Sequence, residues 1–212
     1  KMVALYGPAG TKSVANLHLP AEPMTTVLYA DGTMIINEME SDRASNLKEH
    51  GAVLAETDPL DAENQDNPPW RTVEVFAENA KFIYLGSPVI AKTMAEWFSG
   101  FTKLELFDSE NLNASNAPNM TGMFRNTGIE SEEGLEVIGM KNWQTYSHSE
   151  RITSYMFAGA KVSAIDDLSG WMIGEADSMF EGIVGTLDAG TINLYYGKSF
   201  KNFAADAENL IT

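Results

Sequence analysis

The fold of this sequence is decided by four short stretches: Trp97-Phe98-Ser99-Gly100, Met123-Phe124-Arg125-Asn126, Met156-Phe157-Ala158-Gly159 and Met179-Phe180-Glu181-Gly182. Each places a large apolar pair before a pair of small or polar residues, and Asn202-Phe203 is a weaker fifth copy. From Phe98 onward the phenylalanines recur at steps of 26, 33, 23 and 23 residues. Self-similarity at such a period is typical of architectures in which one structural unit is stacked on the next.

Each copy is followed by a short hydrophobic segment that we expect to form a β-strand. These segments are Leu104–Phe107, Leu135–Ile138, Val162–Ile165 and the neighbourhood of Leu187, and an insertion around Gly128–Gly134 accounts for the longest step. One strand and one helical turn cannot bury their apolar side chains alone, whereas stacked units build a continuous core. The sequence therefore predicts an α/β fold, a right-handed leucine-rich-like solenoid of short parallel strands and short helices, with the Met and Phe anchors inside.

The first part of the chain predicts β-structure and loops. Thr25–Tyr29 and Thr33–Ile36 flank Asp31-Gly32, a strong hairpin signal because both turn positions tolerate positive φ. The polar stretch Glu38–Pro69 predicts a long loop with a short helix near Ser45–His50. This region is expected to be a β-rich cap.

Three further elements are expected around the point where the repeats begin. Trp70–Phe76 and Lys81–Leu85 predict strands, and Ser87-Pro88 predicts the start of a helix over Val89–Phe98. That helix would carry Ile90, Met94, Trp97 and Phe98 on one face. We therefore divide the chain into residues 1–86, a β-rich N-terminal cap region, and residues 87–212, a repeat array with a C-terminal cap.

Composition narrows the classes of function. Fourteen Lys and Arg face thirty Asp and Glu, which gives a formal net charge of -16. Such a surface repels phosphate backbones and anionic lipid headgroups, so we expect no nucleic-acid partner and no direct membrane insertion. The chain has no cysteine, which excludes disulfides, thiolate metal sites and a cysteine nucleophile.

At its anchors the chain resembles the BspA-like bacterial surface proteins, which have a leucine-rich-like repeat of about 26 residues. The residues that carry the resemblance are Ala114–Phe124 as the closest copy, Glu150–Phe157 and Gly174–Phe180 as weaker copies, Leu135–Trp143 and Ile165–Trp171 as strand-then-Trp elements, and Tyr29–Met34 in the cap. The resemblance implies an extracellular or cell-surface location and a role in adhesion. It transfers no catalytic residues, and any signal peptide or wall anchor is expected outside this stretch of sequence.

Patterns that would indicate an enzyme are weak. His18, His50 and His148 lie far apart, and Gly7–Ser13 lacks the spacing of a phosphate-binding loop. Two carboxylates could meet as the acid–base pair of a glycosidase, but a solvated acidic rim explains the same residues. We therefore predict that the chain is not an enzyme, with no catalytic residue, cofactor or dedicated metal site. Acidic loops such as Glu130–Glu133 could take up Ca²⁺.

The aromatic residues are the one positive indication of binding. Trp143, Trp171, Tyr195 and Tyr196 fall at similar places after successive strands, and they are our candidate ligand-binding residues. If exposed in a row they could stack on sugar rings or anchor a protein partner, and if buried they close each unit's core. The leading hypothesis is a secreted or cell-surface adhesion module that binds a host or matrix protein. The alternatives are a carbohydrate-binding module and a structural spacer within a longer surface protein.

Overall fold

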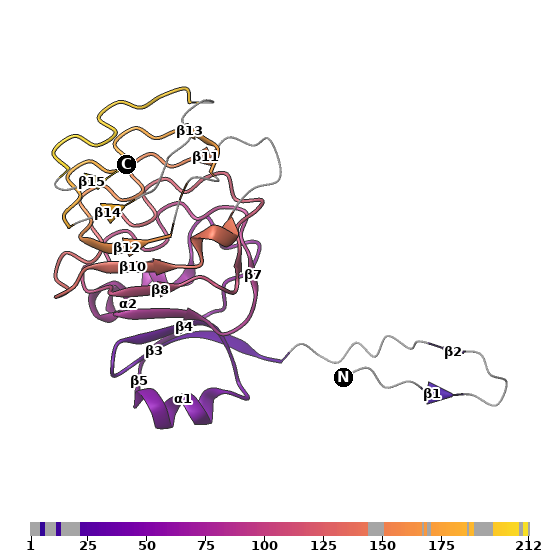
Figure 1. The fold of residues 1–212 in the computed structure, drawn as a ribbon. Coiled ribbons are helices and arrows are strands. Elements are labelled where there is room, and N and C mark those ends of the chain that lie inside the picture. Colours follow the sequence, from indigo (N-terminus) through magenta and orange to yellow (C-terminus); the bar gives the residue numbers. More distant parts are fainter. Residues whose placement is uncertain are drawn as a thin grey trace.

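The computed structural model describes residues 22–143, 151–166, 168, 171–185 and 197–207, and the backbone of four short strands outside these ranges. The fold is mixed α/β with few helices and a mostly parallel sheet of seven strands in the order β12-β10-β8-β6-β4-β3-β5 (Figure 1). Those strands are β3 (Met24–Tyr29), β4 (Thr33–Met39), β5 (Val53–Thr57), β6 (Phe82–Leu85), β8 (Leu106–Asp108), β10 (Leu135–Ile138) and β12 (Val162–Ile165).

The remaining elements are short. The strands outside the large sheet are β1 (Leu5–Tyr6), β2 (Lys12–Ser13), β7 (Val89–Ile90), β9 (Leu112–Asn113), β11 (Arg151–Ile152), β13 (Ile173–Glu175), β14 (Leu187–Asp188) and β15 (Leu210–Ile211). The helices are α1 (Arg43–His50), α2 (Glu74–Asn79), and the 3-10 helices η1 (Pro69–Thr72) and η2 (Met140–Trp143). The pairs β7–β9, β11–β13 and β14–β15 are parallel, and β1–β2 is antiparallel.

The structure confirms several expected elements. β3 and β4 form the predicted antiparallel hairpin, with Gly32 at φ +92° in its turn. The short helix is α1, and the three predicted strands after the first anchors are β8, β10 and β12. β4, β6, β8, β10 and β12 pair parallel in that order, so residues before and after position 86 share one sheet.

Three predictions about this part of the chain are wrong. The expected long loop Glu38–Pro69 contains the strand β5, which pairs with β3. Trp70–Phe76 forms η1 and α2 instead of a strand, because its backbone N–H groups bond to carbonyls three residues back, as Val73 does to Trp70 and Phe76 to Val73. Val89–Phe98 forms no helix, and Ile90 is 64% exposed. Its backbone N–H groups bond to carbonyls about 22 to 25 residues ahead, for example Met94 to Asn119, so no intrahelical ladder can form.

The anchors lie in five six-residue turns rather than in helices. The turns span residues 95–100, 121–126, 154–159, 177–182 and 201–206. In every turn the second and the sixth residue have positive φ: Glu96 and Gly100, Gly122 and Asn126, Tyr155 and Gly159, Ser178 and Gly182, Asn202 and Asp206. Two left-handed residues per turn are incompatible with an α-helix, which corrects the expected short helices of the repeats.

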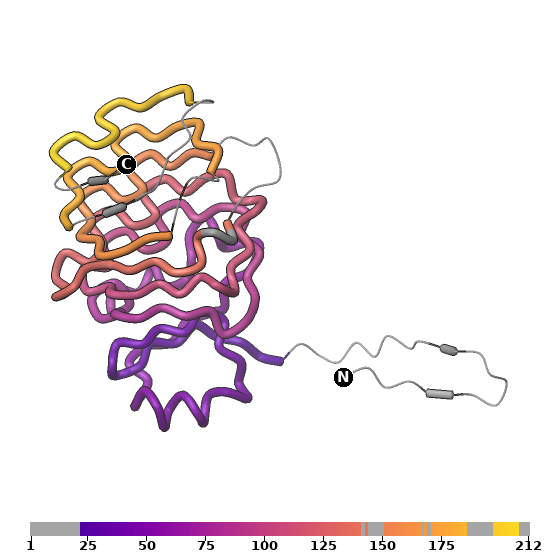
Figure 2. Tube along the Cα trace, viewed as in Figure 1, coloured from indigo at the N-terminus to yellow at the C-terminus, as the bar shows by residue number. Residues whose placement is uncertain are grey.

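Backbone hydrogen bonds join each turn to the next. Met94, Glu96, Phe98 and Gly100 donate their N–H groups to the carbonyls of residues 119, 121, 123 and 125 at 2.8–2.9 Å. The next three junctions repeat the pattern, and successive passes of the chain lie over one another (Figure 2). We call the five hydrogen-bonded turns the turn stack.

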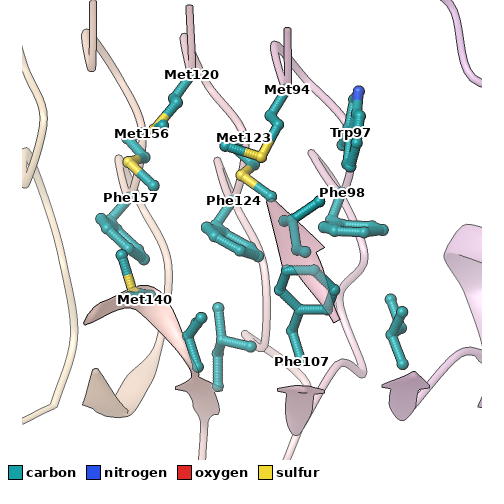
Figure 3. Packing of buried hydrophobic residues seen from close by; sticks show 14 of the residues in the cluster. Met94, Trp97, Phe98, Phe107, Met120, Met123, Phe124, Met140, Met156 and Phe157 are labelled. Carbon is teal, nitrogen blue, oxygen red and sulfur yellow. The ribbon is translucent and has the colours of Figure 1, made fainter. Parts of the chain in front are cut away.

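The anchor side chains fill the space between the turn stack and the sheet (Figure 3). Phe98, Phe124, Phe157 and Phe180 form a column in which successive ring centroids lie 5.8, 5.4 and 5.7 Å apart, with interplanar angles of 26°, 14° and 5°. Their Met and Trp neighbours are also fully buried, which confirms that the anchors are interior. We call these four rings the Phe column.

The fifth anchor differs from its prediction by one residue. Phe157 donates its N–H to the carbonyl of Met179, but Phe180 donates to the carbonyl of Phe203 itself. Phe203 therefore occupies the Met position, and Ala204 occupies the Phe position. The ring of Phe203 meets that of Phe180 edge-on, at 89°, so the stacked column ends at Phe180.

Candidate interaction surface

The candidate site is the outer face of the parallel sheet, on the side away from the Phe column. In β6, Ile83 and Leu85 are buried, whereas Phe82 and Tyr84 point outward and Tyr84 is 36% exposed. The register aligns Phe82 with Leu106, Leu106 with Glu136, and Asp108 with Ile138. The outward residues of three adjacent strands thus form one patch. We call it the open face: Phe82, Tyr84, Leu106, Asp108, Glu136 and Ile138.

Over the cap strands, the same face of the sheet is covered by α1. Val27, Tyr29 and Ile35 form a small buried cluster there, and the ring of Tyr29 lies 5.6 Å from that of His50 at the end of α1. Ile35 pairs with Tyr84 in the neighbouring strand. The open face therefore begins where the cover given by α1 ends.

A buried carboxylate holds α1 in place. Glu38, at the end of β4, accepts hydrogen bonds from the Tyr29 hydroxyl, from Arg43 Nε at 2.7 Å and from Asn46 Nδ2 at 2.6 Å. Burial and the bond to Glu38 raise the pKa of Tyr29 well above its usual range. These three bonds join α1 to the sheet and engage both carboxylate oxygens of Glu38.

The open face combines apolar side chains with acidic ones. Partial burial raises the pKa of the Tyr84 phenol, and the nearby carboxylates of Asp108, Asp31 and Glu49 raise it further. An aromatic ring among carboxylates attracts a cation both through its π-face and through Coulomb forces. Phe82, Leu106 and Ile138 are only half-buried, so apolar surface lies beside this negative potential.

The structure places the candidate aromatics elsewhere. Trp143 is fully buried, its Nε1 donates to Ser109 Oγ at 3.0 Å, and its ring stacks on that of Trp171 at 5.9 Å. Trp171 is 1% exposed and lies under the guanidinium of Arg151 at 4.5 Å. Neither indole can reach a ligand, since both close the core. Tyr195 and Tyr196 lie outside the described residues.

The buried Arg151 beside Trp171 was missed by the sequence analysis. Its Nη1 lies 3.6 Å from Met120 Sδ, while Nε and Nη2 have no acceptor in the described part of the chain. Desolvation lowers the pKa of this guanidinium to about 10. The residue type gives no warning of such burial, because arginine is rarely buried without a partner.

Among the residues that the structure describes, no arrangement of side chains suits metal binding or histidine chemistry. No group of three or more His, Asp or Glu side chains comes together there. The side chains of Glu130, Glu132 and Glu133 are exposed. Lys161 Nζ donates hydrogen bonds to the backbone carbonyls of Ser131 and Glu132 at 2.8 and 2.6 Å. His50 bonds Asp31, while His18 and His148 lie outside the described residues.

A small hollow lies between η1, α2 and the first turn. Its volume is about 220 Å³, and Trp70, Val73, Ala77 and Phe101 supply most of its apolar lining. Ligand pockets usually occupy about 300–1,000 Å³, so this hollow is small for a substrate or cofactor.

Comparisons with known protein families, with curated proteins and with solved structures find no match for this chain. Within the described residues, no helix has the length and apolar character needed to cross a membrane. The open face must therefore be interpreted from its own chemistry. Phe82–Leu85 is a continuous apolar run, so no alternation of polar and apolar residues in the sequence singles out Tyr84.

Proposed function

We propose that this chain is a non-catalytic binding module that recognises a basic protein partner through its open face. The observation that carries the proposal is the outer face of the sheet, which α1 covers over the cap and which the described residues leave exposed or half-buried over β6, β8 and β10. Tyr84 lies at the border of this apolar and acidic patch, next to the part of the sheet that α1 covers, and tyrosine is a residue type enriched among the residues that dominate protein interfaces. A partner that presents arginine or lysine beside apolar side chains complements it.

The architecture that we propose is a short right-handed leucine-rich-like solenoid, as in the BspA-like surface proteins. The recurrent turns, the parallel pairing of β6, β8, β10 and β12, and the Phe column support it. In such an architecture neighbouring units present equivalent outward positions side by side, which builds an extended surface for recognition. The proposed location, secreted or on a cell surface, and the adhesive role follow from that resemblance.

The burial of Trp143 and Trp171 removes the observation that motivated a carbohydrate-binding module. Stacking on a sugar ring requires an exposed aromatic face, and both rings face the protein interior. A protein partner is favoured instead, because the open face places apolar and acidic side chains side by side on three adjacent strands.

The test is binding of the intact chain to an array of purified matrix and host-surface proteins. The double variant Phe82→Ser, Tyr84→Ser should weaken binding of any captured protein by about tenfold or more, since a tyrosine that anchors an interface contributes on the order of 2 kcal/mol. Ile90→Ser is the matched control, because Ile90 is an exposed apolar residue outside the open face. Binding should also weaken as salt is raised. A partner that binds the double variant as tightly as the native chain would refute the proposal.

A further inference from the structure

Helix α1 contacts the sheet through polar side chains alone. Its half-buried residues are Arg43, Asn46 and His50, which lie three and four positions apart and therefore on one side of the helix. No residue of α1 is buried, and Leu47, its one large apolar residue, is 42% exposed. By contrast, the shorter helix α2 inserts the ring of Phe76 into the core. Apolar burial therefore contributes little to the attachment of α1.

Arg43 supplies most of the bonds that attach α1. Its Nε donates to Glu38 at 2.7 Å, and Nη1 and Nη2 donate to the two carboxylate oxygens of Glu56 at 3.3 and 3.0 Å. Nη2 also donates to Thr25 Oγ1 at 2.8 Å. A detached helix would exchange these bonds for bonds to water, so their net contribution to the attachment is modest. An isolated helix of eight residues is itself marginal in water, so α1 depends on this attachment.

The part of the sheet beneath α1 has the same chemistry as the open face. Its apolar side chains and its carboxylates are Val27, Tyr29, Ile35, Glu38 and Glu56. We call Val27, Tyr29 and Ile35 the covered cluster. The strand register places Ile35 between Val27 and Tyr84, so one row of apolar side chains crosses from β3 through β4 to β6. Because α1 covers the first two members of this row and leaves Tyr84 exposed, α1 sets the boundary of the open face.

We propose that α1 is a detachable cover, which leaves the sheet as a unit while the strands beneath it and the repeats stay folded. Detachment exposes the covered cluster beside Tyr84 and frees the carboxylates of Glu38 and Glu56. The open face then extends from β10 to β3, with apolar and acidic side chains along its whole width. That the enlarged face takes the same basic partner rests on the proposed function, whereas the detachment of α1 does not.

Thiol labelling tests the detachment directly, because the chain has no cysteine and one introduced thiol reports one position. Val27→Cys and Leu28→Cys place the thiol at adjacent, fully buried positions of β3, the first beneath α1 and the second on the core side of the sheet. Each variant is treated with iodoacetamide, and the reaction is followed by mass spectrometry. The thiol at position 27 should react at least about tenfold faster, because only α1 must move to expose it. The thiol at position 28 is reached only when the strands of the cap separate.

A second substitution tests the role of Arg43. Arg43→Gln, added to Val27→Cys, should raise the labelling rate by about tenfold or more, because it removes the charge-assisted bonds to Glu38 and Glu56. Lys48→Gln is the matched control, since it removes the same charge from an exposed side chain of α1. This control should leave the labelling rate of the thiol at position 27 nearly unchanged.

Amide hydrogen exchange makes the comparison in the unsubstituted chain. The N–H of Gly51 bonds to the carbonyl of Leu47 at the end of α1, and the N–H of Gly86 bonds to the carbonyl of Ile36 in β4. Both amides belong to glycines, so their exchange without protection is similar. The amide of Gly51 should be the less protected of the two, because it is released with α1 while β4 stays paired.

Three results would overturn the inference. Equal labelling at positions 27 and 28 would show that α1 leaves the sheet only when the cap unfolds. Equal acceleration by Arg43→Gln and Lys48→Gln would show that the bonds of Arg43 do not hold the cover. Equal protection of the two glycine amides would show that α1 is as firmly placed as the sheet. None of these measurements involves a partner, so the proposed function is decided separately, by the binding test of the double variant.

Discussion

Removing one ring from the Phe column tests the core most directly. Phe157 is fully buried, with Phe124 and Phe180 on its two sides at 5.4 and 5.7 Å. Phe157→Ala deletes the ring from a closely packed site, and such changes cost about 3–5 kcal/mol. Loss of two aromatic contacts places the expected value toward the upper part of that range, at about 4 kcal/mol.

The assay is urea denaturation followed by far-UV circular dichroism, with the m-value checked for two-state behaviour. The control is Phe200→Ala, which removes a half-buried ring at the end of the stack and should cost about 1–2 kcal/mol. For a chain of this size, 4 kcal/mol corresponds to a loss of roughly 10 °C in Tm. Equal destabilisation by the two variants, or a cost below about 1 kcal/mol for Phe157→Ala, would refute the stacked core.

The other predictions concern substitutions at four single positions. Gly182→Ala should lower the free energy of unfolding by about 1 kcal/mol in urea denaturation. Gly182 has φ +62° and its added Cβ would meet no atom within 4 Å, so only backbone strain acts. Gly185→Ala should lower the same free energy by about 3 kcal/mol, because its Cβ would lie 2.3 Å from a carbonyl oxygen of β12. Arg151→Met should raise stability at pH 7 by about 1–2 kcal/mol, since it removes a buried charge whose Nε and Nη2 find no acceptor among the described residues. Because burial lowers the pKa of Arg151 to about 10, the penalty is complete below that pH and the gain in stability should shrink as pH rises through it. A gain that is constant from pH 7 to 11 would contradict the argument. Asp108→Asn should lower the pKa of Tyr84, because partial burial and nearby carboxylates raise that pKa. NMR titration of the ring carbons should detect the change, and the control Glu132→Gln should leave the pKa of Tyr84 unaltered.

The interior of the repeats was predictable because it depends on periodicity alone. Met123-Phe124 and Met179-Phe180 recur at a period that only stacking explains, and β10 and β12 fall where the apolar runs of the sequence lie. Apolar residues at short spacing, however, do not distinguish a helix from a turn with left-handed residues. Glu96 and Tyr155 adopt positive φ although neither residue type favours it, because the inter-turn hydrogen bonds impose the conformation.

The candidate surface was harder to predict. Trp143 and Trp171 drew attention because aromatic residues dominate binding sites, yet the same size and apolarity also make them effective core residues. Tyr84 carries no motif, and its exposure depends on where α1 ends over the sheet. The exposure of Tyr84 therefore depends on tertiary packing, which the local sequence does not determine. The one-residue shift at Phe203 was hidden for a similar reason, since only the hydrogen-bond register reveals it.

The common direction of the bonds in the turn stack polarises the molecule along its length. Aligned peptide dipoles add, as they do in an α-helix, so the end near residue 204 carries partial positive charge and the end near Trp97 carries partial negative charge. The guanidinium of Arg71 already meets the carbonyl of Glu96 at the negative pole. The N–H groups of the last described turn thus add a partial positive charge beside the exposed Lys201, in a chain whose formal charge is -16.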